Sequence, residues 1–186
     1  MQAAVQPILW QSLAWPGTIA HRHQASATGF DEQGVASGRT DQGSVFAYAY
    51  TLQLTAQWEI KMVAITSLLD DRRIALRRNG KQWFDEIAHT VLPQFDGVPF
   101  IDISVTPFTN SLPIHQLAFT ADQPQQIQTI FFDENSFSLR KVLQYYTKKD
   151  DHTFQYTDVE IPDFTAELTT DADGIVLTYQ HLFRRA

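Results

Sequence analysis

Residues 44–54, SVFAYAYTLQL, decide the fold class of this chain. Large side chains occupy every second position from Phe46 to Leu54, and small or polar side chains such as Ala47 and Gln53 stand between them. Successive side chains of a β-strand point to opposite faces of the sheet. The stretch therefore predicts a strand with one bulky face and one small or polar face.

The same period of two returns towards the C-terminus. Large and smaller residues alternate over 164–168 and again over 175–179, and the sequence DADG at 171–174 between them is a hairpin signal. Turn signals recur at short intervals elsewhere, and short strands at such spacing are typical of a β-sandwich or β-barrel. Helical patterns are poor, and the best covers residues 83–92, where apolar residues recur at i, i+4 spacing. We therefore predict a mostly β, antiparallel fold in which residues 1–186 form a single domain.

The composition is that of a packed protein with an acidic balance. The chain has 186 residues with 13 Phe, 6 Tyr and 4 Trp, too many aromatic residues for a disordered chain. It has no cysteine, which excludes disulfides, thiolate catalysis and cysteine-ligated zinc or iron–sulfur sites. The formal net charge of −7 argues against a nucleic-acid partner, because phosphate binding needs a basic surface.

The N-terminal stretch lacks the features of a targeting signal. Residues 1–20 contain no Lys or Arg, and Pro7 and the run Trp15-Pro16-Gly17 interrupt the apolar residues. No stretch of the sequence approaches the roughly 18 consecutive apolar residues of a transmembrane helix. We therefore expect a cytoplasmic protein with no transmembrane segment.

Motifs of catalysis are scarce. The chain has no GxSxG, P-loop, GxGxxG or HExxH motif. His21 and His23 form an HxH pair, and on a strand both imidazoles would share a face, as two metal ligands do. No third ligand stands at a metal-site spacing, and two histidines on a solvated face are the commoner arrangement. We therefore expect no catalytic residue, no metal and no cofactor.

Residues 106–114, TPFTNSLPI, differ from ordinary core sequence. Two prolines fix the backbone, and Thr109, Asn110 and Ser111 supply side chains that cap backbone groups. One interpretation is a rigid polar rim that presents hydroxyls and an amide to a ligand. The other, which we favour from sequence alone, is a self-capped crossover between strands. The bulky face of residues 44–54 also has two interpretations: it packs into a filled core, or it lines a cavity that admits a ligand.

The same segment carries a family resemblance. Residues 102–114, DISVTPFTNSLPI, resemble the signature of the putative glycolipid-binding family, a bacterial family of uncharacterised single-domain proteins. The flanking residues 79–83 and 164–185 agree with its pattern. The resemblance implies a curved, incompletely closed antiparallel barrel with short helical segments, similar to lipoprotein-carrier proteins. It also implies a lipid or glycolipid partner.

One departure from the family pattern concerns charge. His115 and Gln116 stand where the family usually has two arginines, so two fixed cations are missing. If those arginines hold an anionic head group in the family, the resemblance implies that this member binds a neutral ligand or binds weakly, with no strong preference for anionic head groups at neutral pH. Protonation of His115 below about pH 6.5 would add some preference for anions.

The resulting hypothesis is a binding module that holds an apolar chain on the concave aromatic face of a β half-barrel. We expect the lining to consist of Tyr48, Tyr50, Trp58, Phe108 and Tyr179, and the polar rim to consist of Asp102, Thr109, Asn110 and His115.

Two alternatives stay open. The first is a hydrolase or isomerase for a lipid- or sugar-like substrate, with Asp102 and His115 as its acid–base pair. Such a pair must lie within hydrogen-bond reach in one cleft, directly or through one water. The second is a non-enzymatic interaction protein with a filled core.

Overall fold

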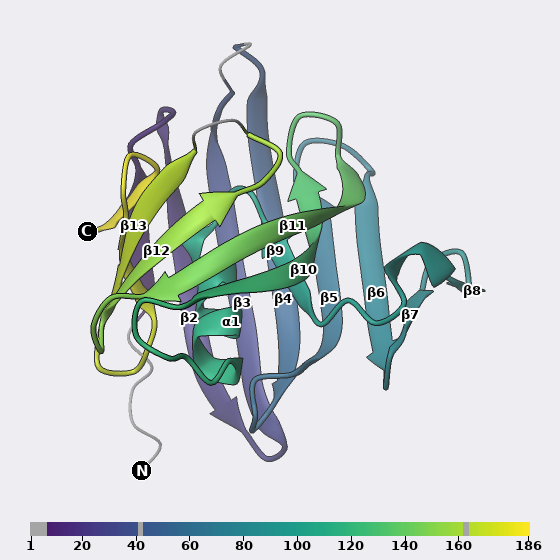
Figure 1. Ribbon diagram of the computed structural model, residues 1–186. Helices are drawn as coiled ribbons and strands as arrows, with labels where there is room; N and C mark the ends of the chain where they lie inside the picture. Colours follow the sequence, from purple (N-terminus) through teal and green to yellow (C-terminus); the bar gives the residue numbers. More distant parts are fainter. Residues whose placement is uncertain (1–6, 41–42, 162–163) are drawn as a thin grey trace.

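The computed structural model describes residues 7–40, 43–161 and 164–186. The protein is mostly β, as predicted, and its strands belong to one large curved sheet with one short α-helix (Figure 1). Among the helices of the described residues, none is long and apolar enough to cross a membrane.

The first half of the chain supplies eight strands in a meander. They are β1 (Ile8–Ser12), β2 (Gly17–Ser26), β3 (Gly29–Arg39), β4 (Val45–Thr55), β5 (Ile60–Ser67), β6 (Arg73–Asn79), β7 (Gln82–Asp85) and β8 (Thr90–Val91).

The second half contains short helical pieces before and after its first strand and forms another meander from β10 onwards. Its elements are η1 (Pro93–Phe95), β9 (Phe100–Ile103), η2 (Pro107–Asn110), α1 (Ser111–Gln116), β10 (Pro124–Asp133), β11 (Ser138–Lys148), β12 (Thr153–Asp158), β13 (Thr165–Thr170), β14 (Val176–Tyr179) and β15 (Phe183–Arg185).

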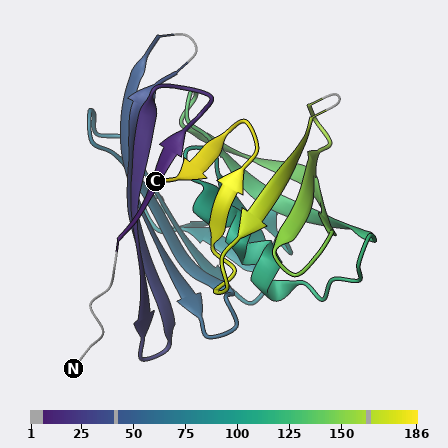
Figure 2. The same cartoon turned by 90° about the vertical axis from the view of Figure 1, so that its left-hand side faces the viewer.

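Pairing of the first and last strands joins the two halves. The strand order is β8-β7-β6-β5-β4-β3-β2-β1-β15-β14-β13-β12-β11-β10-β9. Neighbours are antiparallel except β9 and β10, which are parallel. The second half turns across the concave side of the first half, and α1 lies between them (Figures 1 and 2). The expected curved, incompletely closed sheet is therefore confirmed.

Alternation along the strands sets the position of the core. In β4 the bulky residues Phe46, Tyr48, Tyr50, Leu52 and Leu54 are all buried, and the residues between them face outwards. The predicted strand over residues 44–54 is confirmed, with its bulky face inward.

The weak helical pattern of residues 83–92, the best candidate for a helix in the sequence, does not form one. Residues 82–85 form β7, which pairs with β6 through a tight turn at Gly80 and Lys81, where Gly80 has φ +59°. The Trp83 side chain is fully buried and donates from Nε1 to the Val98 carbonyl at 2.9 Å. The turn residues and the cross-strand pairing outweigh a weak helical period that no capping residue supports.

Candidate functional site

The signature segment, residues 106–114, lies inside the curl of the sheet and is tied to several of its strands. The Thr106 hydroxyl lies 2.8 Å from the Tyr50 hydroxyl of β4. The Thr109 hydroxyl accepts from the Ile103 backbone of β9 at 3.2 Å. This contact confirms the self-capped crossover predicted from sequence.

Two further side chains extend this anchoring to the opposite half of the sheet. Asn110 accepts from the Tyr146 hydroxyl of β11 at 2.7 Å and donates to the Pro107 carbonyl at 3.3 Å. Ser111 accepts from the Val176 backbone of β14 at 3.3 Å. All of these signature side chains are buried, so the segment connects both halves of the curled sheet from within.

Asp102 belongs to the same buried polar group. Its carboxylate accepts from Gln144 Nε2 at 2.6 Å and from the Thr109 hydroxyl at 3.3 Å. Loss of hydration raises the pKa of Asp102 to about 6, against the lowering effect of these two hydrogen bonds. His115 does not belong to this group, because it packs against Trp58. Asp102 and His115, the acid–base pair of the enzyme hypothesis, therefore lie in different surroundings.

The aromatic residues expected to line a concavity lie in packed surroundings. The ring of Tyr48 packs edge-on against Phe132, and its hydroxyl donates to the Glu134 carbonyl at 2.8 Å. Phe108 is fully buried, and Tyr179 packs against Tyr156 with ring centroids 5.5 Å apart. The Tyr50 hydroxyl of β4 lies 2.8 Å from the Thr106 hydroxyl, so the face of β4 and the signature segment are in direct contact.

A pocket of about 550 Å³ opens at one end of the curl, which we call the end pocket. Its lining residues come from β2, β3 and the region of α1, and from the turns β4–β5, β11–β12 and β13–β14 with the strands beside them. Its lining consists of His23, Phe30, Trp58, Ile114, His115, Leu117, Phe119, Lys148, Asp151, His152, Phe154, Thr170, Asp171, Ala172, Asp173 and Gly174. Of the nine expected ligand contacts, Trp58 and His115 line the end pocket. The other seven lie outside its lining, and ligand binding by all nine stays a prediction.

Trp58 enters the end pocket from a strained position in the β4–β5 turn. Its φ is 65°, in the left-handed region that costs a bulky residue about 1–3 kcal/mol. The turn is held by Thr55, whose hydroxyl accepts from the backbone of Gln57 and Glu59, and Gln116 donates to the Trp58 carbonyl at 2.7 Å. These contacts hold Trp58 in a backbone conformation that is unfavourable for a bulky residue.

His115 stacks on this indole. The two ring centroids are 3.6 Å apart and the rings are 8° from parallel. A Cβ on Gly174 would lie 2.7 Å from Nε2 of His115, so the close approach of the imidazole requires glycine there. Lost hydration against these neighbours lowers the pKa of His115. The expected gain of positive charge just below pH 6.5 is therefore disfavoured at His115.

The HxH pair of β2 is tied to a buried carboxylate. His23 lies directly opposite Glu32 of β3, and its Nδ1 is 2.6 Å from Glu32 Oε1. His21 Nε2 is 3.1 Å from Glu32 Oε2. The Glu32 and His21 side chains are fully buried, whereas the His23 side chain is 27% exposed and reaches the end pocket. Within the described residues, no group of three or more acidic, histidine or cysteine side chains is arranged to hold a metal ion.

The protons of this cluster can be assigned. Burial lowers the pKa of His21, so its ring is neutral and carries one proton. That proton lies on Nε2, which donates to Glu32, and Nδ1 then accepts from the Tyr50 hydroxyl at 3.0 Å. Burial also raises the pKa of Tyr50, which keeps its proton, and the Tyr50 oxygen accepts from Thr106 at 2.8 Å. We call the series Thr106–Tyr50–His21–Glu32–His23 the polar chain.

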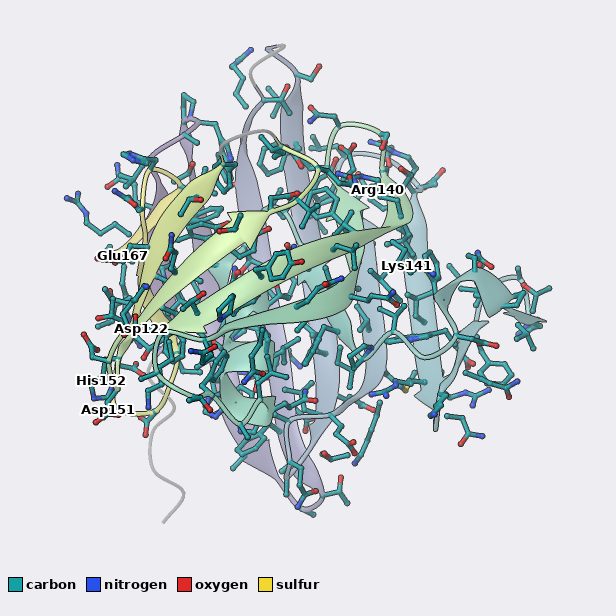
Figure 3. The ribbon with its side chains drawn as sticks, viewed as in Figure 1. Asp122, Arg140, Lys141, Asp151, His152 and Glu167 are labelled. Atoms are coloured by element: carbon teal, nitrogen blue, oxygen red, sulfur yellow. The ribbon has the colours of Figure 1, made fainter. Side chains whose placement is uncertain are left out.

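Carboxylates surround the mouth of the end pocket. Asp171 is paired with Arg185, and Asp151 accepts from Lys148 at 2.9 Å. Asp173 is exposed in the β13–β14 turn. Asp151 and His152 lie at the lower left in Figure 3, away from Arg140 and Lys141 near the other end of β11. The pocket therefore combines aromatic walls with an acidic mouth.

Comparison with protein-family models gives the chain its family. Residues 7–185 match the model described as "Putative glycolipid-binding". The chain belongs to this putative glycolipid-binding family. The resemblance found in residues 102–114 is thereby confirmed. Among curated proteins, no match to this chain was found.

A crystal structure of a DUF1089 family protein from Pseudomonas aeruginosa is similar to this one. The two chains are 26% identical, with a TM-score of 0.80. The match covers 90% of this chain and 92% of the other. The fold of this glycolipid-binding family member therefore also occurs in an experimentally determined structure.

Several residues of the end pocket and of the adjoining histidine cluster could not be identified from the sequence. Phe30, Phe119 and Phe154 look like core residues in the sequence, and Glu32 looks like an ordinary exposed acid. The available signal was the spacing of His21 and His23, which places both rings on one strand face. Only the register of the β2–β3 hairpin, which sets Glu32 opposite His23, reveals the cluster.

Proposed function

We propose that this protein binds a glycolipid or a similar amphiphile, with its neutral, hydroxyl-rich head group in the end pocket. The observation that carries the proposal is the lining of that pocket, which contains both aromatic rings and carboxylates. The family description is consistent with such a ligand. A volume of about 550 Å³ is within the usual range of small-molecule sites.

The chemistry of the lining suits a sugar-like group. Sugar hydroxyls are hydrogen-bond donors, and the carboxylates of Asp151, Asp171 and Asp173 are acceptors. The apolar C–H faces of a sugar ring pack well against aromatic side chains such as Phe30. Asp151 and Asp171 are paired with Lys148 and Arg185, and Asp173 adds a carboxylate beyond these two pairs, so the net negative charge of this group favours a neutral head group over an anionic one.

An apolar wall lies beside the polar mouth. Phe119 packs against Phe154 with ring centroids 5.2 Å apart, and Ile114 and Leu117 of the α1 region continue this surface. Burial of apolar surface contributes about 25 cal/mol per Å². An acyl or alkyl chain laid along this wall would therefore gain several kcal/mol before the costs of association. The packed contact between β4 and the signature segment favours this position over the centre of the curl.

The proposal can be tested with delipidated protein and octyl β-glucoside below its micelle concentration, measured by thermal shift and calorimetry. At a hundredfold excess over the dissociation constant, a ligand that binds only the folded state raises stability by about 2.7 kcal/mol. Phe154→Ala should weaken binding, and Leu69→Ala, on an exposed loop, should not.

Native mass spectrometry of freshly purified protein provides an independent check. We expect a retained amphiphile that solvent extraction releases. The absence of any retained lipid, together with no stabilisation by neutral glycolipids, would contradict the proposed function and favour the filled-core interaction protein.

A further inference from the structure

One ring nitrogen of His23 is hydrogen-bonded to Glu32, and the partly exposed side chain lines the end pocket. Nδ1 hydrogen-bonds Glu32 at 2.6 Å, and the side chain is 27% exposed in the pocket lining. Among the hydrogen bonds of the described residues, none involves Nε2 of His23. This nitrogen is therefore open to a hydrogen bond with a ligand.

Glu32 holds the imidazole in a defined orientation. Its fully buried carboxylate is engaged by both His21 and His23. His21 is held in turn by Tyr50, and Tyr50 by Thr106 of the signature segment. A carboxylate acceptor at Nδ1 fixes which ring nitrogen faces outwards. The polar chain therefore connects Thr106 of the signature segment to His23, which is the one residue of the polar chain that lines the pocket.

The rings around His23 restrict it further. It stacks on Phe30 at 5.1 Å between centroids and lies nearly parallel to the Trp58 indole at 5.5 Å. A buried carboxylate is costly, and an apolar pair would often stabilise the fold at least as well. The need of Glu32 for hydrogen-bond donors does not explain why one of its two histidine partners extends into an open pocket.

We propose that His23 is the specificity-determining residue of the end pocket, where its Nε2 hydrogen-bonds an oxygen of a neutral, hydroxyl-bearing head group. The inference rests on the proposed function and deepens it. A hydroxyl can accept from His23 and at the same time donate to a carboxylate of the mouth, such as Asp173. A phosphate group can accept but meets repulsion from the same carboxylates.

The protonation of His23 depends on charges from several elements. Glu32 and His21 face it within the sheet, and His115 faces it from α1. The remaining charged or titratable groups that act on the cluster or line the pocket are Lys148, Asp151, His152, Asp171, Asp173 and Arg185. The hydrogen bond that His23 donates to Glu32 raises the pKa of His23 above its usual 6.5. A hydroxyl is both donor and acceptor and can bond either form of the ring, whereas a phosphate accepts only from the protonated form.

The test compares two probes with the same alkyl chain, octyl β-glucoside and octyl phosphate, by calorimetry at pH 6 and pH 8. We expect octyl β-glucoside to bind at both pH values with similar affinity, and octyl phosphate to bind more weakly, above all at pH 8. His23→Phe keeps the stacking but removes both nitrogens, and should weaken octyl β-glucoside binding about tenfold. His89→Asn removes an exposed imidazole that is not part of the pocket lining, at a positive-φ position that Asn tolerates, and as the control it should change the affinity by less than about twofold. Equal effects of the two substitutions would overturn the inference.

A measurement on the unmodified protein keeps the inference testable even if the His23→Phe variant misfolds. The ¹⁵N resonance of His23 Nε2 should shift when octyl β-glucoside is added, whereas that of His21 should stay nearly constant. Binding of octyl β-glucoside without a shift at His23 Nε2 would overturn the role of His23 and leave the proposed function intact. Failure of every neutral glycolipid to bind would overturn both.

Discussion

Tyr50 of β4 reaches across β3 to His21 of β2, with its hydroxyl 3.0 Å from Nδ1 of the imidazole. The crossing is possible because Gly34 of β3 has no side chain, and a Cβ there would lie 2.2 Å from the Tyr50 ring. The same hydroxyl contacts Thr106 at 2.8 Å. A single buried oxygen thus connects the family signature to the histidine cluster beside the end pocket.

Tyr50→Phe should destabilise the protein. The change leaves Nδ1 of His21 and the Thr106 hydroxyl without their buried partner, which costs about 1–3 kcal/mol. Denaturant unfolding measures the free energy. Tyr145→Phe is the matched control, because the Tyr145 hydroxyl bonds Gln126 on the exposed face, and we expect a change below about 0.5 kcal/mol. Equal effects of the two substitutions would show that the buried hydroxyl contributes nothing to stability.

Asn110→Ala should cost about 1–3 kcal/mol of stability, because the Tyr146 hydroxyl and the Pro107 carbonyl both lose a buried partner. Asn135→Ala, in the exposed β10–β11 turn, serves as the control. Thermal unfolding gives the comparison. A melting temperature unchanged by Asn110→Ala would contradict the anchoring role of the signature segment and favour a direct ligand role for Asn110.

The raised pKa of Asp102 predicts a pH dependence. In the folded protein this carboxyl holds its proton up to about pH 6, whereas its usual pKa is 3.8. The folded state therefore binds the extra proton, and the contribution of Asp102 to stability falls as pH rises from about 4 to 6. Urea unfolding should show that the difference in stability between wild type and Asp102→Asn is more favourable to wild type at pH 4 than at pH 7. A difference independent of pH would mean that Asp102 titrates normally.

The histidines beside the end pocket should titrate in a definite order. Burial lowers the pKa of His21, lost hydration lowers that of His115, and Glu32 raises that of His23. NMR titration of the ring resonances should therefore find His23 protonating at the highest pH of the three. The stability that His23 contributes is fully present below pH 6.5 and is lost as pH rises through its folded-state pKa. If His115 protonates before His23 as pH falls, the assigned hydrogen bond to Glu32 is wrong.

The sequence predicts the sheet better than it predicts the site. Alternation in residues 44–54 depends only on neighbours along the chain, so it identifies β4 and its buried face directly. Residues 83–92 show the limit of this reasoning, because the pairing of β7 with β6 overrides a weak helical period. Glu32 and His23 are harder still, since their contact depends on hairpin register and on Gly34 admitting the Tyr50 ring. The family signature identified residues that matter for the fold, but most of their side chains are satisfied by the protein itself.

The proposal that the end pocket holds the head group is tested most directly by chemical-shift mapping of delipidated protein with octyl β-glucoside. The account predicts that the largest shifts lie at Trp58, His23, His115 and Gly174, which line the pocket from four different elements. The outer face of the sheet, represented by Met62 and Val35, should change little. Saturable binding with the largest shifts on that outer face, or no saturable shifts at all, would contradict the account.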